Sequence, residues 1–117
     1  MLQKNGRKNR ETTNSIVIYR TNTDEKTNLT KHDVRKQQLD LGMLGLGYHY
    51  IVDLTGEIEK GIDIEAVGVE SPTAICVCIV GGKTDKTKIN KEQQISLDLI
   101  KQFVYQKYNF NLQEEYV

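Results

Sequence analysis

The sequence lacks tryptophan, has a single proline and contains only two cysteines among its 117 residues. Cys76 and Cys78 lie two positions apart in one apolar run, so no framework of disulfides holds the fold together. No run approaches the roughly 18 apolar residues of a membrane-spanning helix. The polar start of the chain also lacks the apolar core of a signal peptide. We therefore expect a fold stabilised by its core alone, no membrane partner and a cytoplasmic location.

The chain also has no net charge, because 16 Lys and Arg balance 16 Asp and Glu. A neutral chain is a poor general binder of nucleic acid. The charges are nevertheless segregated: residues 1–37 carry nine basic and four acidic side chains, whereas residues 38–70 carry one lysine and seven acids. This polarity predicts a binding partner that the protein meets in one orientation, although ordinary solvated loops would also produce it.

The chain is short enough for one domain. Residues 1–13 are basic and have too few large apolar side chains to order themselves, so we predict a flexible basic arm there and a single domain over residues 14–117. Arg7, Lys8 and Arg10 of this arm are predicted binding residues, with RNA as one possible contact.

The apolar pattern predicts strands and helices in an order typical of a mixed α/β fold, with a central β-sheet flanked by helices. Capping residues Thr30 and Asn90 mark the two helix starts. The predicted strands are 15–19, 48–52, 57–60 and 74–80, with 48–52 and 57–60 forming a hairpin. The predicted helices are 31–41 and 91–107. Strand 74–80 is the most apolar and should be central. Val34, Gln38 and Leu41 mark one face of the first helix. The second helix should pack on the sheet through Ile95, Leu99, Ile100, Phe103 and Val104.

Several short motifs occur in a fixed order along the chain. They are Gly47-Tyr48-His49-Tyr50-Ile51-Val52, then Gly56, Glu59, Gly61 and Asp63, then Ala66-Val67-Gly68, and finally the strand Cys76–Gly82. Together they resemble the zinc-dependent N-acetylmuramoyl-L-alanine amidases of the phage lysozyme and peptidoglycan recognition protein family. The resemblance covers residues 15–107 and implies that family's mixed sheet.

The resemblance also implies a chemistry, from which this sequence departs. Family members hold one Zn²⁺ with two His and a Cys or Asp, and the metal activates the water that attacks the amide between N-acetylmuramic acid and L-alanine. Tyr48 matches the family's catalytic tyrosine. Tyr19, a poor zinc ligand, stands where the family has its first ligand. The other ligands lie beyond the family's last helix, so the chain is predicted to be truncated there, without the last strand, and to hold no metal or other cofactor.

The residues themselves lead to the same expectation. The chain has two histidines, His32 and His49, whereas a catalytic zinc site needs about three converging ligands. His32 is expected on an exposed helix face. His49 should be structural, because neighbours in a strand point to opposite faces and Tyr48 takes the other one. Cys76 and Cys78 are expected to be buried small hydrophobes.

These observations favour a catalytically inactive, amidase-like binding protein, encoded by a phage or prophage, that inhibits an intracellular host enzyme or defence complex. A polymerase or an RNA-guided nuclease would be such a target, so the predicted partner is a protein complex or ribonucleoprotein; the oligomeric state stays open. Its binding surface would include the acidic residues Asp53, Glu57, Glu59, Asp63 and Glu65. The alternatives are a peptidoglycan amidase, whose missing ligands a partner supplies, and a non-catalytic peptidoglycan binder.

Overall fold

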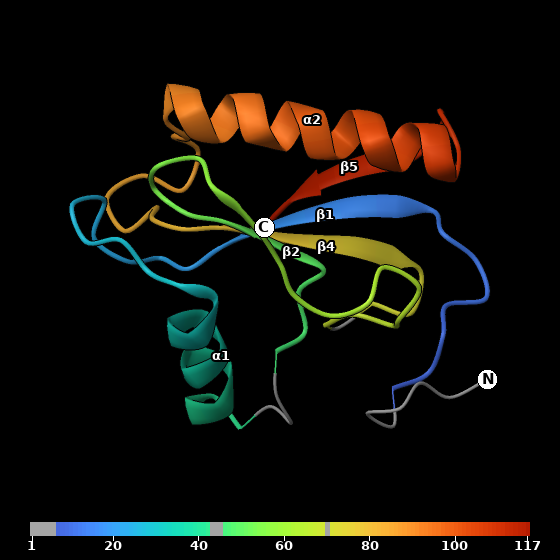
Figure 1. The fold of residues 1–117 in the computed structure, drawn as a ribbon, viewed down its shortest axis with the longest axis horizontal. Helices are drawn as coiled ribbons and strands as arrows, with labels where there is room; N and C mark the ends of the chain where they lie inside the picture. Colours follow the sequence, from blue (N-terminus) through green and yellow to red (C-terminus); the bar gives the residue numbers. More distant parts are fainter. Residues whose placement is uncertain (1–6, 43–45, 70) are drawn as a thin grey trace.

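A computed structural model describes residues 7–42, 46–69 and 71–117. Residues 1–6 of the predicted arm lie outside the described residues. The described residues form five strands and two helices (Figure 1). In order along the chain they are β1 Ser15–Arg20, α1 Lys31–Asp40, β2 Tyr50–Val52, β3 Ile58–Lys60, β4 Ala74–Ile79, α2 Lys91–Lys107 and β5 Gln113–Tyr116.

The strands form one mixed sheet in the order β3-β2-β4-β1-β5. β4 lies in the middle and pairs in parallel with β1 on one side and with β2 on the other. All six residues of β4 are buried, which explains why its sequence is a continuous apolar run. β3 returns antiparallel to β2, as the predicted hairpin requires. The predicted mixed α/β fold with a central strand at residues 74–80 is therefore confirmed.

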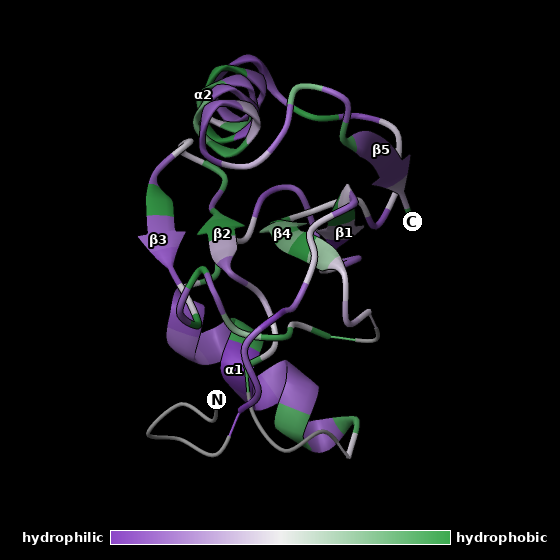
Figure 2. Ribbon diagram, turned by 90° about the vertical axis from the view of Figure 1, so that its right-hand side faces the viewer, coloured by the Kyte–Doolittle hydropathy of each residue, from purple (hydrophilic) through white to green (hydrophobic). Residues whose placement is uncertain are grey.

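The two helices cover opposite faces of the sheet (Figures 1 and 2). α2 packs Leu97, Ile100 and Val104 into the main core, which also contains the strand residues Ile16, Ile18, Val52, Ile75, Val77 and Ile79. α1 contributes Val34 to a smaller cluster on the other face, with Ile51, Cys78 and Val80. Because strand neighbours alternate between faces, β2 and β4 each contribute residues to both clusters. None of the described helices is long and apolar enough to cross a membrane.

Both helices begin at the predicted residues. Thr30 and Asn90 have extended backbones, and their side chains accept hydrogen bonds from the main-chain N–H groups of Asp33 and Gln93. Asp33 and Gln93 accept from the capping residues in return, so each helix starts with a complete capping box. The sequence located these boundaries because a cap is a local interaction.

The chain continues as a strand after α2, so the prediction that the last strand is missing was wrong. β5 runs parallel to β1, with Ile16 opposite Glu114 and Ile18 opposite Tyr116. All four β5 residues are exposed, and such a polar edge strand shows no hydrophobic alternation in its sequence. Lys101 of α2 binds the Glu114 carboxylate at 2.7 Å and helps to hold the edge in place.

The predicted core faces of the helices were partly wrong. In α2, Ile100 and Val104 are buried, but Ile95, Leu99 and Phe103 are 54%, 56% and 49% exposed. Leu41 after α1 is also exposed. The apolar residues of α2 therefore form two rows, only one of which contacts the sheet.

Two isoleucines of α2 offer a matched test of this packing. Ile100→Ala should lower the free energy of unfolding by about 2–5 kcal/mol, because it leaves a cavity in the main core. Ile95→Ala should cost less than about 1 kcal/mol, because the side chain is already half in water. Urea denaturation of both variants measures the difference, and equal losses would show that the second row is also part of the core.

Candidate functional site

Two tyrosines meet on the face of the sheet that α1 covers. The ring centroids of Tyr19 and Tyr48 lie 5.3 Å apart, and the ring planes are tilted by 48°. Both side chains are half-buried and pack on the cluster that contains Val17, Val69 and Cys76. One part of each ring therefore stays open to a ligand.

The sheet register brings this pair together. Tyr19 is near the end of β1 and pairs with Cys78 of β4, while Tyr48 lies two residues before β2 on the other side of β4. Cys76 and Cys78 are small and share the face of β4 between the two flanking strands. Larger side chains there would separate the rings, so the central strand makes the contact possible.

The two hydroxyl groups have different environments. The Tyr19 hydroxyl donates a hydrogen bond to the main-chain carbonyl of Val69 at 3.3 Å. Burial, and then the neighbouring Cys78 and Tyr19, raise the pKa of Tyr48, while burial raises that of the Cys78 thiol to about 12. Both groups are therefore neutral at ordinary pH, and Tyr48 can serve as a hydrogen-bond donor but not as a base.

His49, the residue after Tyr48, is buried, as predicted for a structural residue. Its Nδ1 accepts a hydrogen bond from the main-chain N–H of Cys76 at 2.9 Å, which leaves the proton on Nε2, 2.8 Å from the carbonyl of Ala66. Gly68 packs directly against this ring, since a Cβ there would lie 2.8 Å from its Cε1 atom. The Ala66-Val67-Gly68 motif is thus a support for the segment that carries Tyr48.

Arg10 completes this support, and the sequence did not predict that role. Its side chain is buried, and Nη1 donates to the carbonyls of Ile64 and Ala66 at 2.6 and 2.7 Å. Arg7 donates to the carbonyls of Val67 and Leu46, and Lys8 pairs through its main chain with Val67. The prediction of a flexible arm is therefore wrong for residues 7–10, because Arg7 and Arg10 donate hydrogen bonds to main-chain carbonyls of the domain.

The predicted acidic residues are not gathered into one free surface. Asp53 is buried and accepts hydrogen bonds from Asn28, Thr55 and the N–H of Glu57. Burial alone would raise its pKa, but these bonds lower it below the usual value. Glu59 accepts from the main-chain N–H of Lys31 at the start of α1.

The remaining acids lie around β3. The Glu65 carboxylate contacts the hydroxyl of Tyr108 and, at 3.6 Å, the ammonium of Lys107. Asp63 accepts from the main-chain N–H of Glu65, and Glu57 is exposed. A binding role for these residues stays a prediction, but four of the five predicted acids already have hydrogen bonds or ion pairs within the fold.

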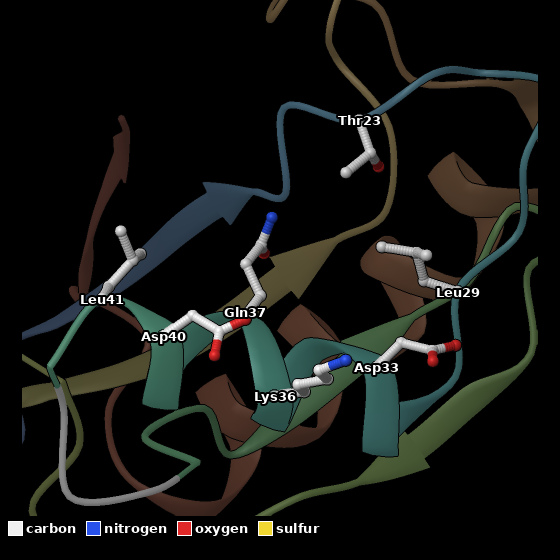
Figure 3. A pocket seen from close by; sticks show the side chains of 7 residues that line it. All are labelled: Thr23, Leu29, Asp33, Lys36, Gln37, Asp40 and Leu41. Carbon is white, nitrogen blue, oxygen red and sulfur yellow. The ribbon is translucent and has the colours of Figure 1, made fainter.

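A shallow pocket of about 370 Å³ lies apart from the tyrosines, along α1 and the segment after β1 (Figure 3). Its lining combines Asp33, Lys36 and Asp40 with four uncharged side chains. Asp33 belongs to the capping box of α1, and the Gln37 amide donates to the carbonyl of Thr21. These groups serve the local fold, and none of the predicted site residues lines the pocket.

A zinc ion does not fit the donors that the described residues offer. They contain no group of three or more His, Cys, Asp or Glu side chains that could hold a metal ion. Tyr19 stands at the predicted ligand position, and its hydroxyl donates a hydrogen bond to the carbonyl of Val69. His49 is buried, and both of its ring nitrogens already have hydrogen-bond partners in the domain.

Comparison with known proteins identifies phage proteins named endolysin as relatives of this chain. No protein-family model matches the chain. It is 34% identical over 87 residues to a protein named endolysin of Escherichia phage T7, a match that covers 71% of this chain and 58% of the relative. The chain thus spans little more than half the length of the curated relatives that it matches.

Solved structures show the same fold. The N-acetylmuramoyl-L-alanine amidase LysC from Clostridium intestinale superposes with a TM-score of 0.75 at 24% identity, covering 88% of this chain and 69% of that one. The bumblebee peptidoglycan recognition protein PGRP-SA superposes with a TM-score of 0.74 at 13% identity, covering 91% and 70%.

The shared fold, together with the endolysin relatives, confirms the resemblance that the motifs predicted. The chain belongs to the family of N-acetylmuramoyl-L-alanine amidases and peptidoglycan recognition proteins. Within that family its curated relatives are phage endolysins.

The same relatives correct the predicted function. We expected an inhibitor of a host polymerase, RNA-guided nuclease or other intracellular complex, but the relatives and structural neighbours are named endolysins and amidases. That expectation rested on the poor fit of the chain to zinc. A missing metal site says nothing about which host protein the chain would bind. The alternative of a peptidoglycan-directed protein agrees better with the relatives.

The buried His49 predicts how stability depends on pH. Burial, with the charge of Arg10 nearby, lowers the pKa of His49 from 6.5 to about 4, so the unfolded state binds more protons between these values. Stability should therefore be full above pH 6.5 and fall by roughly 3 kcal/mol as the pH decreases to 4.

Chemical denaturation at a series of pH values tests this prediction. His49→Gln should remove most of the slope between pH 4 and 6.5, whereas His32→Gln, at an exposed position of α1, should keep it. An unchanged slope in His49→Gln would assign the acid sensitivity to the carboxylates instead.

Proposed function

We propose that this chain recognises peptidoglycan as part of an N-acetylmuramoyl-L-alanine amidase, with the Tyr19–Tyr48 face as its binding surface. The observation that carries the proposal is the 34% identity to a phage endolysin over 87 residues. The Tyr19–Tyr48 face contains Tyr48, the residue that matches the family's catalytic tyrosine in the resemblance.

The chemistry of the two tyrosines suits a glycopeptide. Each ring offers an apolar face to the C–H groups of a sugar or an alanine methyl group, and a hydroxyl at its rim. The Tyr48 hydroxyl stays neutral at ordinary pH because burial raises its pKa, and it already interacts with the buried Cys78 thiol, so Tyr48 would contact the ligand through its ring. His49, Gly68 and Arg10 hold the segment behind it in place.

The described residues supply binding and orientation, but not a complete hydrolytic site. In an amidase of this family, zinc provides the activated water for the amide bond, and the donors described here do not fit that ion. We therefore expect recognition by this chain alone, and cleavage only where a further segment or partner supplies metal ligands.

Sedimentation with insoluble peptidoglycan tests the recognition. The chain should pellet with the polymer, and Tyr19→Ala should weaken this binding at least about tenfold, or roughly 1.4 kcal/mol. Tyr116→Ala is the matched control, because Tyr116 is exposed and contacts Lys101 on the α2 side of the sheet. An unbound chain, or equal losses in the two variants, would contradict the proposal.

The same samples test the expected division between binding and cleavage. Addition of zinc to the chain alone should leave the polymer intact, and metal analysis should find well under one zinc per chain. Stoichiometric zinc together with release of soluble peptide would show that the chain completes a metal site by itself.

A further inference from the structure

Gln38 of α1 holds the segment that carries Tyr48. Its side chain is buried, and its Oε1 atom accepts a hydrogen bond from the main-chain N–H of Gly47 at 2.8 Å. A buried N–H group needs such a partner, because water does not reach it. Since Gly47 directly precedes Tyr48, Gln38 fixes the backbone next to the tyrosine.

A series of hydrogen bonds continues from Gly47 to the other tyrosine. The Gly47 carbonyl accepts from the main-chain N–H of Val69 at 2.9 Å, and the Val69 carbonyl accepts from the Tyr19 hydroxyl at 3.3 Å. Gly47 and Val69 approach closely, since a Cβ on Gly47 would lie 2.9 Å from the Cβ of Val69. A displacement of Gly47 would therefore also move the carbonyl that binds Tyr19.

Gln37, the neighbour of Gln38 in α1, holds the segment after Tyr19. Its amide donates to the carbonyl of Thr21, two residues beyond Tyr19, at 3.1 Å. Figure 3 shows the Gln37 side chain pointing from α1 toward the end of β1. Because the Thr21 N–H also pairs with the Ile79 carbonyl at the end of β4, this end of β1 is fixed from both the sheet and the helix.

A buried glutamine in α1 does more than fill space. Val34 and Gln38 are the buried residues of α1, so the helix has a single buried apolar side chain among its described residues. Apolar packing has no preferred direction, whereas a hydrogen bond requires a particular distance and angle. An amide at position 38 therefore defines where Gly47 lies, which an apolar side chain of the same size would not do.

We propose that Gln37 and Gln38 are positioning residues, which set the spacing and tilt of the Tyr19 and Tyr48 rings and thereby how tightly this face holds peptidoglycan. The inference rests on the proposed function of that face. Each glutamine acts through main-chain groups of a tyrosine segment and not through the ligand. Two rings that contact one ligand bind it best when their spacing is fixed in advance, because no ordering is then needed on binding.

Gln93 of α2 provides a matched control. It is 1% exposed, compared with 2% for Gln38, and its side chain donates to the main-chain carbonyls of Asp53 and Val80 at 3.1 and 2.8 Å. Both residues are thus buried helix glutamines with main-chain partners, but those of Gln93 belong to neither tyrosine segment. Gln38→Met and Gln93→Met should both lower the urea concentration at which the chain unfolds.

Sedimentation with insoluble peptidoglycan, together with NMR of the free chain, tests the proposal. Gln38→Met should weaken binding at least about fivefold. Gln37→Met should weaken it at least about twofold, because water can replace part of this half-buried contact. Both variants should weaken the nuclear Overhauser effects between the ring protons of Tyr19 and Tyr48. Gln93→Met should leave the binding and these ring contacts unchanged despite its lower stability.

The outcomes separate this inference from the proposed function. A parent chain that does not pellet with peptidoglycan contradicts the proposed function and, with it, the inference. If the parent chain binds, equal binding or unchanged ring contacts in Gln38→Met overturn the inference alone. An equal loss of binding in Gln93→Met also overturns it, because general destabilisation would then explain the effect. If Gln38→Met does not fold, Gln37→Met decides in the same way.

Discussion

The parallel pairing of β4 with both β1 and β2 is the constraint on which the rest of the structure depends. It buries β4 on both faces and gives each helix an apolar surface to cover. It also sets the distance between Tyr19 and Tyr48, because both lie next to the same strand. A shift of one residue in the β1–β4 register would turn Tyr19 into the main core. The candidate site is therefore a consequence of sheet register.

Behind the site, main-chain carbonyls do much of the positioning. Arg10 binds the carbonyls of Ile64 and Ala66, while Arg20 at the end of β1 binds those of Ile79, Lys86 and Lys88. Both guanidinium groups are buried, and burial lowers the pKa of Arg20. An arginine can hold several carbonyls at once because its donors form a planar fork. Two loops on opposite ends of the sheet are fixed in the same manner.

A shared fold and a shared reaction are separate properties of this family. Strand pairing, the glycines and the capping boxes maintain the fold, whereas zinc chemistry needs a few ligands that the fold does not require. The motif residue Gly61 illustrates the first property, since a Cβ there would lie 2.1 Å from the carbonyl oxygen of Tyr48. Tyr19 illustrates the second, because it packs well where a metal ligand is expected.

The sequence by itself determined the local and periodic features: the capped helix starts, the buried strand at residues 74–80, the hairpin and the family motifs. These follow from interactions within a few residues or from a continuous apolar run. The tertiary structure alone decided that Arg10 binds the domain, that β5 forms an edge, and that Ile95 and Leu99 face outward. Each of these depends on groups far apart in the chain, so neither composition nor periodicity records it.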